Sequence, residues 1–153
     1  MQLELRPITT LDAARGLGPR LDAAAAAFQA QFSDETYPAG SAERFLERAL
    51  GEPETVLLGA YKPGTETPSG LCLIGAHVDT LSGERIPMVL VLHVDDELRH
   101  RGVARGLVER ARALLEARGI KRLAARALHN DDALISMGER WGFVRAWEWM
   151  LYE

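Results

Sequence analysis

One strand-to-helix connection in the second half of the chain constrains the fold more than any other feature. Residues 88–94 form a continuous apolar run with the length and composition of a buried strand. After a short polar loop, apolar residues recur at helical spacing over residues 103–118, and Gly119 supplies a common helix end. The chain therefore passes from a strand into a long amphipathic helix through a tight turn that contains Gly102.

Periodicity and turn residues predict the elements on either side of this connection. In chain order they are a strand at 2–8, a helix from Pro19 to about residue 32, a helix at 42–50, strands at 55–61, 70–79 and 88–94, the helix at 103–118, a strand at 120–128, a short helix ending at Gly142, and an extended aromatic segment at 143–152. This order is neither a regular alternation of strands and helices nor an all-β series. It predicts an α+β fold with a mixed sheet.

Local signals set three of the expected boundaries. Ser41 is a good N-cap for the second helix, and one of Asn130, Asp131 or Asp132 is expected to cap the last one. Pro87 has no N–H to give to a sheet, so we expect the well-paired part of its strand to begin after it.

Length and composition exclude several classes of protein. With 153 residues the chain suits a single domain, which we predict to span residues 1–153. The only cysteine, Cys72, cannot form a disulfide within the chain, and the four histidines lack zinc-like spacing, so we expect no metal. No apolar run approaches the ~20 residues that span a bilayer, and the N-terminus lacks the pattern of a signal peptide. We therefore expect a cytoplasmic protein with no membrane partner.

Charge is divided unevenly along the chain. Residues 1–98 hold 7 Lys and Arg against 15 Asp and Glu, whereas residues 99–153 hold 11 against 7. A basic segment inside an acidic protein is typical of a local site for a polyanionic ligand, although solvated arginine-rich helix faces give the same count. The acidic overall balance argues against nucleic acid as a partner.

The turn before the long helix has the features of a pyrophosphate site. The first turn of a helix leaves backbone N–H groups unpaired and carries a positive partial charge. Gly102 and Ala104 let a phosphate approach the backbone, and Arg99, Arg101 and Arg105 add positive charge around the same turn. The alternative is a tight strand-to-helix turn in which the glycine serves packing alone.

The motif Arg99-x-x-Gly102-x-Ala104, preceded by the strand end Leu92-His93-Val94, resembles the acetyl-CoA signature of the GNAT superfamily of N-acetyltransferases. The family pattern is Arg/Gln-x-x-Gly-x-Gly/Ala after an aliphatic-x-Val strand end. Further matches near the end of the chain are Asn130-x-x-Ala133 and Gly142-Phe143. The order of elements agrees with the family over nearly the whole chain.

The resemblance implies a largely antiparallel mixed sheet that is splayed between strands 88–94 and 120–128, with helices on both faces. Acetyl-CoA would lie in that split, with its pyrophosphate on the turn at 101–106 and its pantetheine arm along the first strand. A backbone N–H of this strand would polarise the thioester carbonyl, and an acceptor amine would attack it directly in a ternary complex. The residues implied to bind acetyl-CoA are Leu92, Val94, Arg99, Arg101, Gly102, Val103, Ala104, Arg105, Gly106 and Asn130.

Attack by an amine calls for a base. An alkylammonium has a pKa near 10.4, so only about one molecule in a thousand is unprotonated at neutral pH. His93 lies on the strand beside the implied carbonyl site, and we predict it as the base. His77 and Asp79 on the neighbouring strand and Glu35 in a loop are alternatives, as are a core role for His93 and a water chain with no dedicated base.

The leaving thiolate calls for an acid. Family members commonly carry a tyrosine on the helix before Gly-Phe, but that position is Gly138 counted back from Gly142 and Met137 counted forward from Asn130. Ser136 is the nearest hydroxyl and is the candidate acid. Glycine inside a helix is unfavourable by roughly 1 kcal/mol relative to alanine. Gly138 therefore marks either the close approach of another group, such as the cofactor, or a tolerated surface or packing position.

The end of the chain is apolar on both faces of a predicted strand, because Trp147, Trp149 and Leu151 alternate with Met150 and Tyr152. Such a strand is able to pair across a homodimer, although packing within one chain is the simpler arrangement. A cysteine in an apolar strand, as Cys72 is, is predicted to belong to the core rather than to act as a nucleophile.

We therefore predict an N-acetyltransferase that transfers an acetyl group from acetyl-CoA to a primary amine of a small molecule or peptide. The acidic first half of the chain favours a cationic acceptor. The missing tyrosine leaves a non-catalytic acyl-CoA-binding or sensing module as the alternative. A Rossmann-type nucleotide binder is not expected, because its glycine turn follows the first strand and the turn here comes late in the chain.

Overall fold

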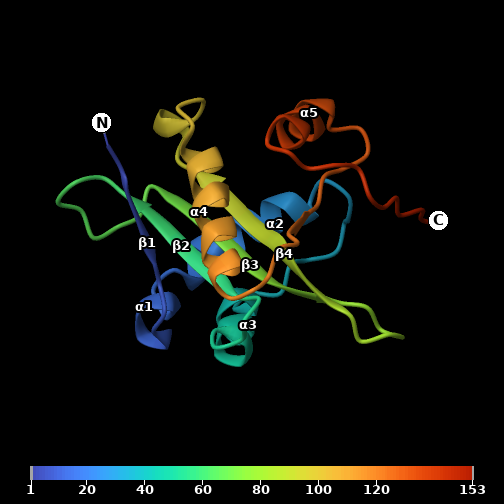
Figure 1. Cartoon of the computed structure of the whole chain (residues 1–153), viewed down its shortest axis with the longest axis horizontal. Helices are drawn as coiled ribbons and strands as arrows, with labels where there is room; N and C mark the ends of the chain where they lie inside the picture. Colours follow the sequence, from blue (N-terminus) through green and yellow to red (C-terminus); the bar gives the residue numbers. More distant parts are fainter. Residues whose placement is uncertain (1, 153) are drawn as a thin grey trace.

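The computed structural model describes residues 2–152 and contains one five-stranded sheet (Figure 1). The strands are β1 (Glu4–Pro7), β2 (Val56–Tyr61), β3 (Gly70–Val78), β4 (Arg85–Val94) and β5 (Ala124–Ala125), and they lie side by side in this order. The first four strands pair antiparallel, whereas β5 pairs parallel to β4. The predicted hairpin between residues 55–61 and 70–79 is confirmed.

Helices cover both faces of the sheet, as expected. The helices are α1 (Leu11–Arg15), α2 (Gly18–Gln29), α3 (Ser41–Ala49), the single 3-10 turn η1 (Asp96–Leu98), α4 (Val103–Ala117) and α5 (Asp132–Arg140). Helices α1, α2 and α3 pack on one face, and α4 crosses the other, which faces the viewer in Figure 1. The short helix α1 is an addition that the sequence pattern did not predict. It is capped by Thr10, whose hydroxyl accepts a hydrogen bond from Ala13 N at 3.4 Å.

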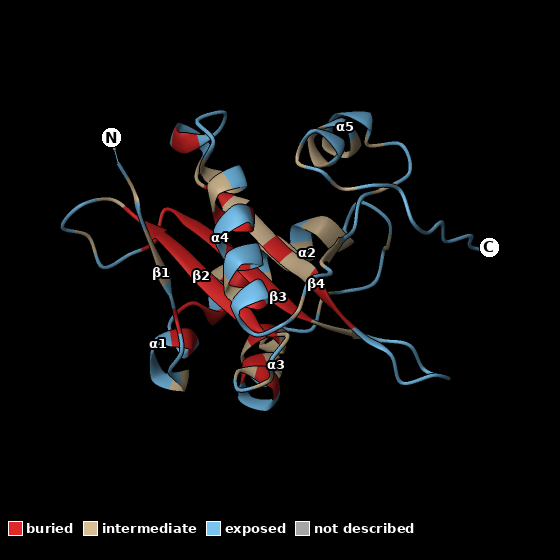
Figure 2. Ribbon diagram, viewed as in Figure 1, coloured by how far each residue is buried: buried red, intermediate tan, exposed pale blue. Residues whose placement is uncertain are grey.

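Strand alternation divides the core into two clusters. On β3, Leu71 and Leu73 point to the cluster under α1–α3, whereas Cys72 and Ile74 point to the cluster under α4. All four side chains are buried, and β2 is buried along its whole length. Figure 2 shows β2 and most of β3 in the colour of buried residues. None of the described helices is long and apolar enough to cross a membrane.

The N-terminus of α3 is capped from a neighbouring helix, not by Ser41 as predicted. The N-cap residue is Gly40, which has a left-handed φ of 80° and no side chain to offer. Asp22 of α2 takes over the role: its carboxylate accepts hydrogen bonds from Ala42 N at 2.8 Å and from Gly40 N at 3.0 Å. The Tyr37 hydroxyl donates a third bond to Asp22 at 2.9 Å. Ser41 becomes the first helical residue, and its hydroxyl turns back to the carbonyl of Pro38.

The ends of α4 and α5 follow the predicted glycine signals. Gly119 and Gly142 have φ of 80° and 94°, a left-handed conformation in which glycine carries little strain. In each case the next residue donates back to the last turn: Ile120 N to Leu115 O at 2.9 Å, and Phe143 N to Gly138 O at 3.0 Å. Of the three candidates for the N-cap of α5, Asp131 fills the position and accepts from Leu134 N at 3.1 Å.

Pro87 lies inside β4, so the expectation that pairing begins after it is wrong. The register continues through Ala76↔Pro87 to Arg85. Asp79 N donates to Glu84 O at 2.9 Å, so Asp79 and Glu84 form a hydrogen-bonded pair at the end of the hairpin. Because these pairs alternate, Pro87 sits in a non-hydrogen-bonded pair and its nitrogen faces away from β3. The ladder therefore loses no bond.

The last third of the chain is less regular than predicted. The strand expected over 120–128 contains only Ala124 and Ala125, because its pairing with β4 ends at Val89. The segment expected as a strand over 143–152 has no regular structure, and its large apolar side chains are exposed. Helix α5 has no buried residue and stands apart from the sheet in Figure 1.

We predict that Asp22→Ala lowers the free energy of unfolding by about 2 kcal/mol, because it leaves two backbone N–H groups and a hydroxyl without their acceptor. Tyr37→Phe removes one of the three bonds and lowers it by about 1 kcal/mol. Urea denaturation followed by circular dichroism measures both effects. Asp34→Ala, at an exposed loop position, is the control and leaves stability within experimental error. Equal stability of the Asp22 and Asp34 variants would contradict this account of the α3 cap.

Candidate active site

Strands β4 and β5 separate after a short parallel contact. Among the described residues, they pair only at Met88↔Ala124 and Val89↔Ala125. The separation coincides with a β-bulge: Ile74 of β3 pairs with Val89, but Leu73 pairs with Val91, so Leu90 has no partner. A bulge bends its strand and increases the local twist. The second half of β4 therefore turns away from β5, which confirms the predicted splay.

Leu92 and Val94 direct their backbone groups toward this split. Asp95 N donates to Ser69 O at 2.9 Å, so Asp95, and with it His93, faces β3 through its main chain. The N–H and C=O groups of the alternate residues, Leu92 and Val94, then face the other way. The carbonyl of Val94 accepts the Arg99 Nε at 3.3 Å, in agreement with this orientation. Main-chain groups at a split of this kind are able to bind an amide-bearing ligand and to polarise a carbonyl.

The loop after β4 ends at an open helix N-terminus. Gly102 is the N-cap of α4, has a left-handed φ of 78°, and provides no side-chain cap. No acidic residue lies in the first turn of α4. His100 also has a left-handed φ, 62°, and no other described residue except glycine does. The first N–H groups of α4 are thus free for an anion, and a strained backbone two residues earlier holds the loop that exposes them.

A hollow of about 420 Å³ borders this N-terminus. Its lining comes from β1, η1, the loop and the first turn of α4: Leu3, Leu5, Leu98, Arg101, Gly102, Val103 and Gly106. The hollow lies toward β1, whereas the split lies between β4 and β5 at the other edge of the sheet. The residues of the loop and of the first turn of α4 therefore stand between the two.

The three predicted phosphate-binding arginines differ in their availability. Arg99 is held by the Val94 carbonyl and by Asp96 at 3.0 Å, so it braces the loop. Arg105 pairs with Glu109 on the next turn at 2.7 Å. Arg101 lines the hollow, and within residues 2–152 no carboxylate lies at ion-pair distance from it. Arg101 is therefore the arginine that an anion meets without displacing a partner.

The other predicted cofactor residues are divided between the helix and the C-terminal loop. Ala104 packs against the cluster under α4, and Gly106 lies against the Leu5 side chain, 3.8 Å from where a Cβ would stand. Asn130 is exposed in the loop before α5, well separated in sequence from the turn at 101–106. Its role in cofactor binding stays a prediction.

His93 stands on the face of β4 that α2 covers and is half-buried. Its Nε2 lies 3.5 Å from Asp95 Oδ1, and Arg20 of α2 contacts the same oxygen at 3.1 Å. The alternative His77 lies beside Trp147, with ring centroids 6.2 Å apart.

The carboxylate alternatives are less suitable as bases. Asp79 closes the β3–β4 turn, and the backbone N–H of Ser82 lowers the pKa of its carboxyl below the usual range. Glu35 is exposed in the loop before α3. Asp79 is therefore committed to the turn, and the histidines remain the better candidates.

The candidate acid Ser136 is exposed on α5. A Cβ at Gly138 would lie 3.9 Å from the Phe143 Cβ, an ordinary van der Waals distance, so this contact does not require glycine. The Gly138 carbonyl accepts Phe143 N at 3.0 Å in the turn that ends α5.

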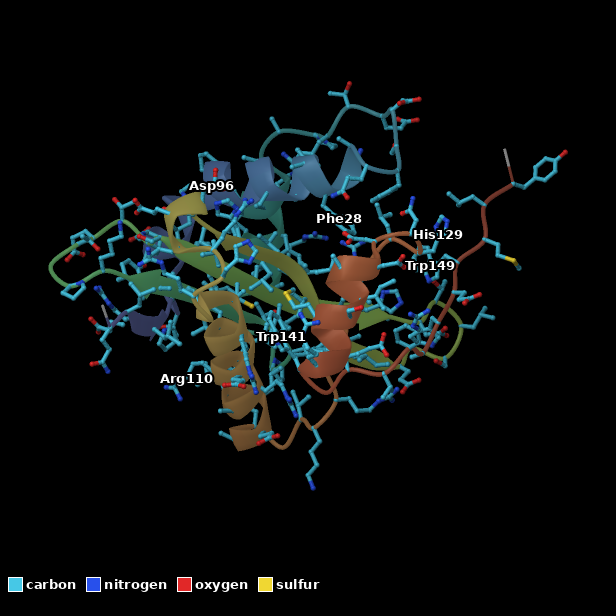
Figure 3. All side chains as sticks on the ribbon, turned by 90° about the horizontal axis from the view of Figure 1, so that it is seen from above. Phe28, Asp96, Arg110, His129, Trp141 and Trp149 are labelled. Atoms are coloured by element: carbon cyan, nitrogen blue, oxygen red, sulfur yellow. The ribbon has the colours of Figure 1, made fainter. Side chains whose placement is uncertain are left out.

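Three contacts in this region join segments that are distant in the sequence. The Arg126 guanidinium lies over the Phe28 ring of α2 at 5.1 Å, which links the chain after β5 to α2. Figure 3 shows Phe28 facing the loop that carries His129. Arg20 and Asp95 meet from elements 75 residues apart. Tyr37, in the loop before α3, donates to Asp22 of α2, and burial raises the pKa of its phenol. No local pattern in the sequence signals these contacts between distant segments.

A comparison with protein families agrees with the fold. The model of the acetyltransferase (GNAT) family matches residues 21–143. No curated protein sequence matches the chain significantly.

Solved structures of acetyltransferases superpose over almost the entire chain. A probable acetyltransferase gives a TM-score of 0.68 at 21% identity, covering 100% of this chain and 96% of the other. Ribosomal-protein-alanine N-acetyltransferase from Brucella melitensis biovar Abortus 2308 gives 0.67 at 20%, covering 100% and 99%. Aminoglycoside N-acetyltransferase AAC(6')-Iy in complex with CoA gives 0.70 at 17%, covering 99% and 94%. At these identities the likeness shows a common fold.

Acyl transfer can also proceed through a cysteine thioester, so the single cysteine has a bearing on the chemistry. Cys72 is fully buried in β3, and burial raises the pKa of its thiol to about 12. A thiol that stays protonated and out of reach of solvent is a poor nucleophile. Cys72 is a core residue, as predicted.

We predict that Cys72 does not react with Ellman's reagent in the folded protein at about pH 8 and reacts fully after unfolding in guanidinium chloride. Absorbance at the thionitrobenzoate band measures the released anion, and one thiol per chain is expected in the unfolded sample. Rapid stoichiometric labelling of the native protein would show that the thiol is accessible.

Proposed function

This chain belongs to the acetyltransferase (GNAT) family, and on that premise we propose that it transfers an acetyl group from acetyl-CoA to a primary amine by direct attack in a ternary complex. One observation carries the proposal: the second half of β4 is paired with β3 but not with β5, and it leads through η1 and a short loop to the uncapped N-terminus of α4. The first feature suits a thioester arm and the second suits a pyrophosphate. We treat residues 1–153 as one catalytic domain, of which residues 1 and 153 lie outside the described range.

The residues present fit the phosphates and the arm of acetyl-CoA. The first N–H groups of α4 and the Arg101 guanidinium supply an anion site without a competing carboxylate in the first turn. Leu92 and Val94 supply main-chain groups at the split, where the arm would run. Acetyl-CoA brings the activated acetyl group as a thioester, and no metal is needed to activate it.

The protein's own contribution is to polarise the carbonyl and to deprotonate the amine. A main-chain N–H in the second half of β4 donates to the carbonyl oxygen as negative charge develops there. His93, beside Leu92 and on the α2 face, accepts a proton from the incoming ammonium. Ser136, which is exposed on α5, is our candidate donor to the leaving thiolate.

We propose a cationic acceptor. The support is the excess of acidic residues in the first 98 residues, which include α2 and α3. Two structural neighbours carry names that specify transfer to nitrogen, one on aminoglycosides and one on a ribosomal protein. The acceptor classes to test are therefore polyamines, aminoglycosides, amino acids and peptide N-termini.

A non-catalytic acyl-CoA-binding or sensing module is the second candidate. The observation in its favour is that neither Gly138 nor Met137 supplies the hydroxyl of the tyrosine that family members commonly carry. Such a module would bind acetyl-CoA without releasing CoA in the presence of any amine.

We also propose that the chain acts in the cytoplasm as a homodimer joined through residues 143–152. A single buried thiol is compatible with a reducing compartment. The C-terminal segment exposes large apolar side chains, with Trp149 at 76% and Met150 at 94%. Pairing with a second copy would bury them.

Binding and turnover together test the proposed activity. We expect acetyl-CoA and CoA, but not NAD, to raise the melting temperature, and a pooled panel of the four acceptor classes to give thiol release from acetyl-CoA. Gly102→Glu abolishes both, because it places bulk and negative charge on the open amides. Gly83→Glu is the matched control, since Gly83 has a similar φ of 72° and open space around it but lies in the β3–β4 turn.

The outcomes separate the candidates. Binding with no thiol release across the panel selects the sensing module. Unchanged acetyl-CoA affinity in Gly102→Glu removes the assignment of the phosphate site.

Sedimentation equilibrium tests the dimer. We expect the wild-type chain to have twice the mass of one chain, and the double variant Trp147→Ser, Trp149→Ser to be monomeric. Leu81→Ser is the control, because Leu81 is 98% exposed on the β3–β4 turn and outside the segment. A monomeric wild-type protein refutes the proposed interface.

A further inference from the structure

Asp95 and Arg20 join the end of β4, α2 and the β2–β3 loop next to the candidate base. Asp95 follows β4 directly, and its Oδ1 lies 3.5 Å from His93 Nε2 and 3.1 Å from Arg20 Nη2. The other terminal nitrogen of Arg20 donates to the carbonyl of Pro68 in the β2–β3 loop. Arg20 thus reaches from α2 and is anchored at both ends of its guanidinium.

Strand geometry places this cluster on the face of β4 that α2 covers, which is where the proposed function puts the acceptor. His93 and Asp95 are two residues apart, so their side chains project from the same face, which α2 covers. Leu92 and Val94 project to the opposite face and pack in the cluster under α4. The main-chain groups that would hold the thioester therefore lie next to the imidazole that would meet the amine. The main-chain groups face the split, whereas the imidazole projects from the face that α2 covers.

We infer that Asp95 and Arg20 are positioning residues for His93, an inference that rests on the proposed function. The Asp95 carboxylate, 3.5 Å from His93 Nε2, favours the tautomer that carries its proton on Nε2, which leaves the Nδ1 lone pair for the acceptor. Arg20 of α2 fixes the position of the Asp95 carboxylate. The carboxylate in turn restricts rotation of the His93 imidazole. Among the described residues, Asp95 and Arg20 are the charged side chains at ion-pair distance in this cluster.

During the reaction the acceptor nitrogen loses two protons. The acceptor ammonium gives one proton to His93 Nδ1, and the freed nitrogen lone pair forms a C–N bond with the thioester carbon. The C–S bond breaks and its electron pair leaves on the sulfur. The nitrogen loses its second proton as the amide forms, and the thiolate takes up one proton. The products are amide, CoA thiol and one proton returned to solvent from His93.

Steady-state kinetics of Asp95→Asn, Arg20→Gln and His93→Gln test this inference. The acceptor is spermidine or kanamycin, whichever the wild-type protein acetylates faster. At about pH 7 we expect kcat to fall about 100-fold in His93→Gln and about tenfold in each of the other two, with an unchanged KM for acetyl-CoA. Adding Asp95→Asn to His93→Gln causes no further loss, because both act through the same imidazole.

Raising the pH separates a positioning role from a structural one. At about pH 9.5 far more of an alkylamine is already unprotonated, so a base matters less. We therefore expect the deficits of all three variants to shrink severalfold. A structural defect would persist at both pH values. Asp12→Asn is the matched control, since Asp12 forms an exposed pair with Arg15 on α1, and it leaves kcat unchanged.

Three results overturn the inference: a normal kcat in Asp95→Asn, an equal loss at both pH values, or a further loss in the double variant. If Asp95→Asn does not fold, as judged by its melting curve, Arg20→Gln carries the same test from α2. Failure of the wild-type protein to release thiol refutes the proposed function itself, which keeps the two failures distinct.

Discussion

The bulge at Leu90 is the feature on which the site depends. A parallel pair of strands normally uses every main-chain N–H and C=O along its length. Here one unpaired residue bends β4, and pairing with β5 stops at Val89. The N–H and C=O of Leu92 and the N–H of Val94, which a neighbouring strand would have occupied, are left for a ligand, whereas the Val94 carbonyl accepts Arg99 Nε. The bulge in the β3–β4 ladder thus leaves main-chain groups on the β5 side of β4 without a strand partner.

The same strand continues into the second half of the site. Arg99 turns back to the Val94 carbonyl, so the loop between β4 and α4 is held to the strand end. The strain at His100 and the left-handed turn at Gly102 then bring the chain into α4 with its first amides uncovered. The arginines divide the work: Arg99 braces the loop, Arg105 pairs with Glu109, and Arg101 stays available.

The sequence predicted helix ends correctly where only neighbouring residues form the structure. Gly119 and Gly142 end their helices because only the last helical turn and the next two residues take part in the motif. The cap of α3 was misassigned because the better acceptor, Asp22, comes from another helix. The shortness of β5 was equally hidden, since it is decided by where β4 bends. The arginine motif identified the turn, but the Arg20–Asp95 contact spans 75 residues and has no local signature.

Asp22 fixes α2 and α3 relative to each other, which limits how a different acceptor can be accommodated. It ties α2 to the start of α3, and α2 also contacts Asp95 through Arg20 and Arg126 through Phe28. The two helices therefore form a fixed platform, and tilting one to admit a bulkier acceptor would break the bonds to the other. New acceptor preferences are more accessible through exchange of single side chains on that platform than through movement of its backbone.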